Sequence, residues 1–314
     1  MCPEETIDWL MEGDPAIRWQ VLRDLVGAPE SEWEVERSKV GRGNDWAGRF
    51  IALQDPGGTW GGGLYSPKWT STTYTLLTLI ECGLAGDHPA ARKGADLILE
   101  RAFSSKEVIG MGHRLKTDLC VLGFWLRIGC TFLAGDPRLP PIAEHILACQ
   151  MADGGWNCRI RIAKDVVHSS FHTTFNVLDG LRAAASVRIV AEDQFRNAEA
   201  RALEFMLAHR LYLSDKSGEV IHPSFMKFSY PVRWHHDVLR GLDYFRSTSE
   251  IRDPRLGDPI ELLESKRRPN GRWPSQNKHA GIVFFDMERT GADSRWNTLR
   301  ALRVLRAIDG WPSS

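Results

Sequence analysis

The sequence predicts an all-α protein, folded as an α/α toroid in which outer and inner helices pair around a ring. Amphipathic helices alternate with helices that are apolar on nearly all sides. Three of the turns within these pairs carry glycine and tryptophan, and the helix–turn–helix unit recurs roughly every 45 to 60 residues. Strand-like alternation of polar and apolar residues is nearly absent. We therefore expect residues 1–43 to form N-terminal helices that pack on the barrel, and residues 44–314 to form the toroid as a single domain.

The first segment is predicted to be a helix, a turn and a second helix. The turn lies at Gly13-Asp14-Pro15, where Asp14 can cap the second helix and Pro15 occupies its first position. Ile17, Val21 and Leu25 give that helix one apolar face. The charged stretch 30–42 is typical of a solvated helix or a surface arm.

Five helix pairs follow, each with a more amphipathic helix before a more apolar one. Because only one face of the first helix is apolar, we expect it on the outside of the ring and its partner on the inside. The predicted pairs are 46–53 with 70–83, 89–103 with 117–129, 141–150 with 170–185, 192–209 with 232–245, and 259–266 with 294–308.

Composition excludes several classes of protein. Lys and Arg number 40 and so do Asp and Glu, so the chain has no basic field for nucleic acid. The N-terminus lacks a basic region followed by an apolar run, and no apolar window reaches the length of a transmembrane helix, so we expect neither a signal peptide nor a membrane span. The six scattered cysteines favour reduced thiols in a cytoplasmic protein. The 12 tryptophans indicate large core pieces or an aromatic-lined cavity.

The turns with tryptophan resemble a known repeat. Gln54-Asp55-Pro56-Gly57-Gly58-Thr59-Trp60, residues 150–156 (QMADGGW) and residues 268–273 (RPNGRW) resemble the Q/W repeats of squalene and oxidosqualene cyclases. Residues 171–181 resemble an inner helix of the protein prenyltransferase β subunits. The resemblance covers roughly residues 44–309 and implies the α/α toroid of that superfamily, which holds cyclases, prenyltransferases and binding proteins. The D-x-D-D acid motif of class II cyclases is absent, and the chain has length for one barrel where full cyclases use two.

In such a toroid the first turns of the inner helices converge on one mouth of the central cavity. The acid–base candidates at these positions are Asp118 and Asp237, with Glu288 as a third option and His172 and His236 as residues that would tune them. A carboxyl group at an apolar mouth would have a raised pKa suited to proton transfer. Equally, each carboxylate is typical of a first helical turn, where the helix dipole favours it.

Histidines suggest a metal as the alternative chemistry. His168 and His172 are four residues apart, which places them on one face if the helix begins at His168. With Cys158 and the run His235-His236-Asp237 they could bind one zinc ion, and the resemblance implies a comparable Asp, Cys and His ligand set. The same histidines could instead cap helices and join neighbouring loops.

Aromatic residues near these helix starts could line a substrate pocket. Their π faces would stabilise a carbocation or a hydrocarbon chain, and Arg295 could hold a diphosphate or a carboxylate. The candidates are Tyr65, Trp69, Trp125, Phe171, Trp234, Arg295 and Trp296. For Trp60, Trp156 and Trp273 we expect a structural role, in which the indole fixes its turn to an outer helix.

Three functions remain open from the sequence. The first is an isoprenoid-type enzyme, cyclase- or prenyltransferase-like, that binds a hydrophobic small molecule in the central cavity. The second is a zinc-dependent hydrolase that uses the His/Asp cluster at the same mouth. The third is a non-catalytic lipid- or peptide-binding protein. The sequence leaves the oligomeric state and the substrate undetermined.

Overall fold

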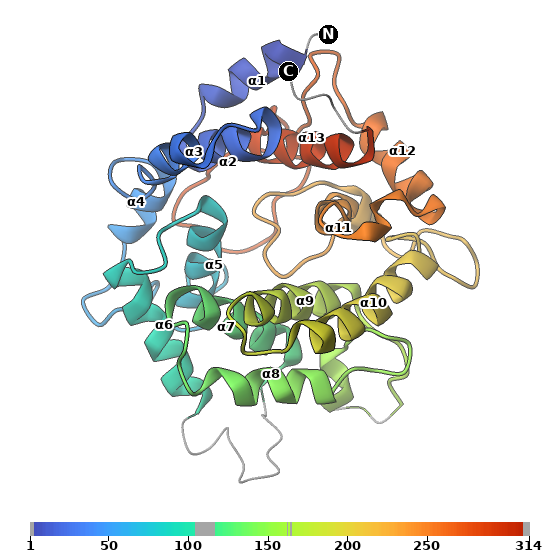
Figure 1. Cartoon of the computed structure of the whole chain (residues 1–314), viewed down its shortest axis with the longest axis horizontal. Coiled ribbons are helices and arrows are strands. Elements are labelled where there is room, and N and C mark those ends of the chain that lie inside the picture. The colour runs from blue at the N-terminus through green and yellow to red at the C-terminus, as the bar shows by residue number, and fades with distance from the viewer. Residues whose placement is uncertain (1–2, 104–116, 162, 164, 310–314) are drawn as a thin grey trace. The chain divides into compact units, whose positions relative to one another are not determined.

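The described structure is helical, as the sequence predicts. It is a computed structural model that describes residues 3–103, 117–161, 163 and 165–309 (Figure 1). Over these residues it contains 13 α-helices and no strand, with only isolated β-bridges between loops. None of the described helices is long and apolar enough to cross a membrane. The chain divides into two compact units, which are described separately below.

The first unit, here called the middle unit, comprises Leu53–Ile80 and Gly86–Met206. Its helices are α5 (Thr72–Cys82), α6 (Pro89–Ala102), α7 (Leu119–Phe132), α8 (Leu139–Ala148), the short 3-10 helix η2 (Cys158–Arg161), α9 (Phe171–Ser186) and α10 (Glu192–Ala208). Helix α7 packs along α9, while α6 and α8 lie against α7. The predicted contrast between helices holds here, because α7 and α9 are buried along most of their length and α6 buries one face.

Two glycines allow α7 and α9 to approach unusually closely. A Cβ atom on Gly123 would lie 2.4 Å from the carbonyl oxygen of Asn176, and one on Gly180 would lie 2.4 Å from that of Gly123. Such contacts are far shorter than van der Waals separation, so any side chain here would force the two helices apart. The backbones of these two helices therefore meet directly.

The second unit, here called the terminal unit, comprises Met1–Ala52, Glu81–Ala85 and Leu207–Ser314. Its α-helices are α1 (Pro3–Met11), α2 (Pro15–Val21), α3 (Glu30–Arg37), α4 (Trp46–Ile51), α11 (Val238–Phe245), α12 (Gly257–Ser265) and α13 (Arg295–Asp309). Short helices are the π-helix η1 (Leu22–Val26) and the 3-10 helices η3 (Pro223–Met226), η4 (Ser249–Arg252) and η5 (Pro254–Leu256). Helix α13 packs against α11 and against α2, so the N-terminal helices lie beside the C-terminal one (Figure 1).

The tryptophan turns share one hydrogen-bond pattern, which occurs in both units. The backbone N–H of Trp60, Trp156 and Trp273 donates to a threonine Oγ1 of the following helix, at 3.0 Å in each case. In the last two turns the indole N–H donates over 2.8 Å to the carbonyl ten residues earlier, in α8 or α12. All three tryptophan side chains are fully buried. For Trp156 and Trp273 the predicted link from the indole to the preceding helix is thus observed.

Glutamine extends the pattern in the two turns of the middle unit. The side-chain amide of Gln54 donates to the carbonyls of Gly58 and Ala90. Gln150 likewise donates to the carbonyls of Gly154 and Ala198. One amide thus closes its turn and ties it to a later helix, α6 or α10. In the third turn Arg267 takes the place of glutamine and lies over the Trp273 ring.

Most predicted helices are observed within two residues, but three features differ. Helix α11 begins at Val238, six residues later than predicted, because Asp237 caps it and residues 232–237 form a loop. Helix α9 begins at Phe171, so His168 lies outside it and the predicted shared helical face with His172 is absent. The second helix changes to π geometry at Leu22 and ends at Gly27 in the left-handed conformation.

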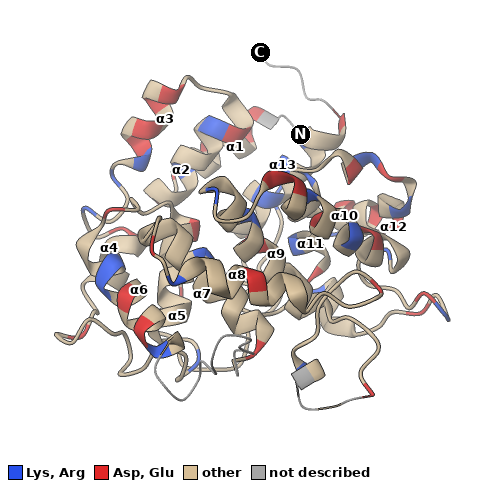
Figure 2. Ribbon diagram, turned by 60° about the horizontal axis from the view of Figure 1, so that its bottom comes forward, with Lys and Arg blue, Asp and Glu red and all other residues tan. Residues whose placement is uncertain are grey.

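Charged residues of both signs are interspersed along the described helices (Figure 2). This distribution agrees with the equal numbers of acidic and basic residues in the chain.

Candidate functional site

The terminal unit holds a carboxyl group beside stacked aromatic rings, at the start of α13. We call this set, Glu288 with Ser294, Trp296, Tyr230 and Trp46, the α13 acid cluster. Ser294 caps α13 by accepting the N–H of Asn297 at 2.9 Å, and its hydroxyl donates to Glu288. Glu288 also accepts the N–H of Trp296 at 3.2 Å. Glu288 is thereby fixed at the N-terminus of α13.

Burial controls the protonation of Glu288. Loss of water raises the pKa of its carboxyl group above the ordinary value of 4.5, although the hydrogen bonds from Ser294 and the α13 backbone oppose the change. The net effect is a carboxyl group that exchanges its proton closer to neutral pH than an exposed glutamate does.

The aromatic part of the cluster is a stack of three rings. Tyr230 lies on Trp296 with ring centroids 4.2 Å apart and planes 14° apart, and Trp46 lies 6.1 Å from Trp296 at 25°. Trp296 is only 2% exposed, whereas Tyr230 and Trp46 are partly exposed. Trp296 therefore supports the two partly exposed rings.

Arg295 has a different environment from the one predicted. Its Nε donates to the backbone carbonyl of Trp9 at 3.0 Å, and its guanidinium lies over the Trp9 ring. Its Nη2 is 3.7 Å from Glu12. These contacts fix α1 to the start of α13, so the guanidinium serves the fold.

Asp237 is a fully engaged structural carboxylate. It is 2% exposed, accepts the N–H of Arg240 at 2.8 Å as the cap of α11, and accepts both the N–H and the hydroxyl of Ser229 at 3.1 Å. Three donors from the protein occupy its oxygens. This is the helix-capping alternative that the sequence left open.

The loop histidines of the terminal unit stack instead of converging on a metal. The rings of Trp234, His235 and His279 are stacked with centroids 3.7 and 3.8 Å apart, and His279 Nε2 is 3.0 Å from the Ser229 hydroxyl. Burial lowers the pKa of His279 to about 4, so it is neutral at neutral pH. His236 is buried, with Nε2 2.8 Å from the Leu211 carbonyl oxygen.

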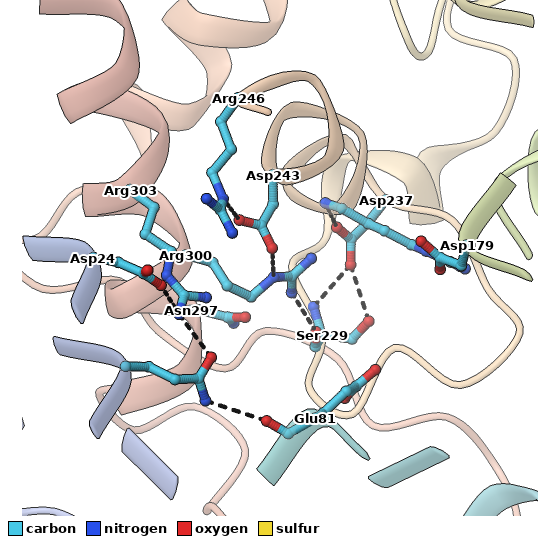
Figure 3. Close-up of polar contacts among 12 residues, drawn as sticks. Asp24, Glu81, Asp179, Ser229, Asp237, Asp243, Arg246, Asn297, Arg300 and Arg303 are labelled. Atoms are coloured by element: carbon cyan, nitrogen blue, oxygen red, sulfur yellow. Dashed lines mark hydrogen bonds and ion pairs between the residues drawn. The ribbon is translucent and has the colours of Figure 1, made fainter. Parts of the chain in front are cut away.

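An ion cluster built on the buried Arg300 and Arg303 joins α11 and α13 in the same unit. Figure 3 shows Arg300 and Arg303 of α13 reaching toward Asp243 of α11 and Asp24 of η1. Asp243 contacts Arg246 at 2.7 Å and Arg300 at 3.4 Å, and Asp24 pairs with Arg303. Burial would raise the pKa of Asp243, but these guanidinium groups outweigh it and hold that pKa below 3.8.

The middle unit carries a second chemically distinctive cluster, around Cys158. Cys158 is the first residue of η2, and its Sγ accepts the backbone N–H of Cys120 at 3.3 Å and the hydroxyl of Thr173 at 3.4 Å. Asp118 precedes α7 at its N-cap position, and its negative charge opposes the ionisation of both thiols. Burial raises the pKa of the nearby Tyr65 to about 12. Asp118, predicted as an acid, and Cys158, predicted as a metal ligand, thus lie close together.

The other predicted aromatic residues of the middle unit lie largely in its core. Trp69 meets Tyr74 edge-on at 4.8 Å, Trp125 donates its indole N–H to the Thr73 hydroxyl, and Phe171 packs on Phe205. His172 lies in the first turn of α9 and is partly exposed, whereas His168 is exposed and precedes that helix.

The predicted zinc ligands do not form a metal site in the part of the chain that the structure describes. No group of three or more His, Cys, Asp or Glu side chains among those residues could hold a metal ion. His235 is stacked between two rings and Asp237 is occupied by three donors. The described residues therefore do not fit a zinc centre.

Several residues of these clusters were not predicted from the sequence. Tyr230, Ser229 and His279 come from loops, and Ser229 and His279 meet because residue 229 forms a β-bridge with Asn277. Cys120 has a signal that could have identified it, because a cysteine at the second position of an apolar helix presents its N–H at the helix terminus. No such local signal exists for the loop residues.

Comparisons with known proteins leave the chain without a family assignment. No protein-family model matches the chain. A search of curated proteins likewise finds no match.

Proposed function

We propose that the chain is an α/α toroid related to the terpenoid cyclases and protein prenyltransferase β subunits, and that it acts as an isoprenoid-type enzyme. The observation that carries this proposal is the α13 acid cluster, where a carboxyl group of raised pKa adjoins stacked aromatic rings. Support for the toroid comes from the tryptophan turns, whose common hydrogen-bond pattern recurs in both units.

In this proposal Glu288 exchanges a proton with a hydrocarbon substrate. As a carboxylate it takes a proton from the carbon beside a carbocation, and the electrons of the broken C–H bond form a C=C bond. The partly exposed rings of Tyr230 and Trp46 stabilise the cation beforehand through their π faces. A raised pKa suits this step better than protonation of an alkene, which requires an unusually strong acid.

The other predicted acids are less suited to this role. Asp237 is held by three hydrogen bonds inside the protein, and its loss would uncap α11. Asp118 lies beside the Cys158 thiol in the middle unit. Glu288 is therefore the residue to test first.

A substrate panel tests the proposal. The purified full chain is incubated with geranyl, farnesyl and geranylgeranyl diphosphate, and the extracts are examined by gas chromatography with mass spectrometry. We expect at least one hydrocarbon or alcohol product. Glu288→Gln should lower its rate by about 10²–10⁴-fold, the usual worth of one proton-transfer group. Glu264→Gln, an exposed carboxylate of α12, is the matched control and should keep full activity.

The outcomes separate the functions that the sequence left open. Tight binding of an isoprenoid without turnover would show that the chain is a binding protein and not an enzyme. Turnover that survives Glu288→Gln but not Asp118→Asn would move the acid–base role to the other carboxyl group.

A further inference from the structure

Cys158 and Cys120 form a thiol pair in the middle unit that the isoprenoid chemistry does not use. Both are free and partly exposed cysteines. Cys120 is the second residue of α7, and Cys158 opens η2, 38 residues later. The backbone N–H of Cys120 points at Cys158 Sγ from 3.3 Å, and the Cys120 thiol donates to the same sulfur.

Three donors therefore converge on one sulfur atom. The third is the hydroxyl of Thr173, 3.4 Å away in the first turn of α9. A sulfur that accepts several hydrogen bonds at a helix N-terminus is stabilised as the thiolate. Asp118 and the Tyr65 hydroxyl also face this pair, and the negative charge of Asp118 opposes ionisation.

These interactions change the pKa values of the two thiols in opposite directions. The hydrogen bond from Cys120 is the largest cause that lowers the pKa of Cys158, to about 7, while the same bond raises the pKa of Cys120 far above its ordinary value. Cys158 is thus the more readily ionised of the two thiols, and the proton is held at Cys120 beside it.

The remaining described cysteines lack this environment. Cys82 is fully buried and burial raises its pKa, and burial raises the pKa of Cys130 to about 12. Cys149 lies 3.8 Å from His145 Nε2. A reagent that requires a thiolate should therefore select Cys158.

We propose that Cys158 is a peroxide-reactive thiol and that Cys120 is its resolving partner. The Cys158 thiolate attacks one oxygen of a hydroperoxide, so that an S–O bond forms, the O–O bond breaks and the leaving hydroxide or alkoxide takes up a proton. Cys158 becomes a sulfenic acid while the peroxide is reduced. Cys120 then attacks the oxidised sulfur, an S–S bond replaces the S–O bond, and the hydroxyl leaves as water with the Cys120 proton.

Hydrogen peroxide with mass spectrometry tests this proposal. The full chain is treated with a small molar excess of peroxide, digested without reductant, and its peptides are mapped. We expect a Cys120–Cys158 disulfide in the wild type. In Cys120→Ser we expect a sulfenic acid at Cys158, trapped by dimedone. Oxidation that falls mainly on another cysteine, or that persists unchanged in Cys158→Ser, would overturn the proposal.

Two further variants guard against a merely structural explanation. Thr173→Val removes one donor to the thiolate and should slow the reaction with peroxide several-fold, whereas Cys149→Ser should leave the rate unchanged.

If Cys158→Ser does not fold, the rate of iodoacetamide labelling at Cys158 in the wild type is measured against pH. A midpoint near 7 supports the assignment, and a midpoint near that of an ordinary thiol contradicts it. These readouts are independent of any isoprenoid turnover.

Discussion

Glu288 combines features that oppose each other at a single residue. It lies at the N-terminus of α13, where the helix dipole and two donors stabilise the carboxylate. Burial nevertheless prevails, and the pKa of the carboxyl group is raised. A group in this balance is easily switched between its two forms, which is the property that a proton-transfer residue requires.

The raised pKa of Glu288 predicts a specific dependence of stability on pH. Because the folded pKa lies above the unfolded value, the native state binds the extra proton, and stability falls as pH rises through the raised pKa. Glu288→Gln keeps the shape of the side chain without ionising. We expect its free energy of unfolding, relative to the wild type, to increase from pH 4 to pH 8, as measured by urea denaturation. A difference that is constant over this range would show that the pKa of Glu288 is not raised.

At the scale of elements, each tryptophan turn is bonded to the helix that follows it, and two of the three turns are also bonded to the helix before them. Each turn is closed by backbone hydrogen bonds, and its tryptophan joins the following helix through threonine. Gln150 adds a bond from the turn to α10. The stability of a helix pair should therefore depend strongly on these few polar side chains.

Gln150→Ala tests this dependence. It leaves the carbonyls of Gly154 and Ala198 without their side-chain donor, so we expect a loss of about 1–3 kcal/mol in the free energy of unfolding. Gln194→Ala, at an exposed position of α10, is the control and should change it by less than about 0.5 kcal/mol. Equal effects of the two substitutions in chemical denaturation would contradict the structural role of the turn.

The ion cluster between α11 and α13 predicts acid sensitivity. The pKa of Asp243 in the folded protein is lowered. Its ionised form therefore stabilises the fold above pH 3.8, and this stabilisation is lost as the pH falls through the lowered pKa. Asp243→Asn should lower the free energy of unfolding by about 1–3 kcal/mol at pH 7. This loss is smaller than that from breaking a fully buried ion pair, because the Asp243 side chain is 22% exposed. The cost should shrink toward acid pH. Asp286→Asn, in an exposed pair with Lys278, should have little effect.

The sequence predicts the helices better than it predicts the candidate sites. Periodicity locates α9 and α13 to within one residue, because each carries a continuous buried face. It misplaces the start of α11, where apolar Val232 and Trp234 extend the pattern into a loop. The position of Glu288 before a predicted inner helix makes it a candidate from the sequence alone. Tyr230 has no such signal, because only tertiary contacts bring its loop to Trp296.

At the scale of the whole molecule, the two units are strongly interleaved in the chain. The chain passes between them four times, and α5 and α10 each contain residues of both. If the units are parts of one toroid, as proposed, they should unfold together. We expect one calorimetric transition whose van't Hoff and calorimetric enthalpies agree. Two resolved transitions would contradict the single ring.

Single-turnover chemistry on Glu288→Gln tests the proposed function most directly. The variant and the wild type are saturated with the isoprenoid diphosphate that the panel identifies, the reactions are quenched over time, and bound substrate and product are quantified. We predict equal initial binding and a slowing of product formation by about 10²–10⁴-fold in the variant. Product formation at the wild-type rate by Glu288→Gln would contradict the assignment of the α13 acid cluster as the reaction centre.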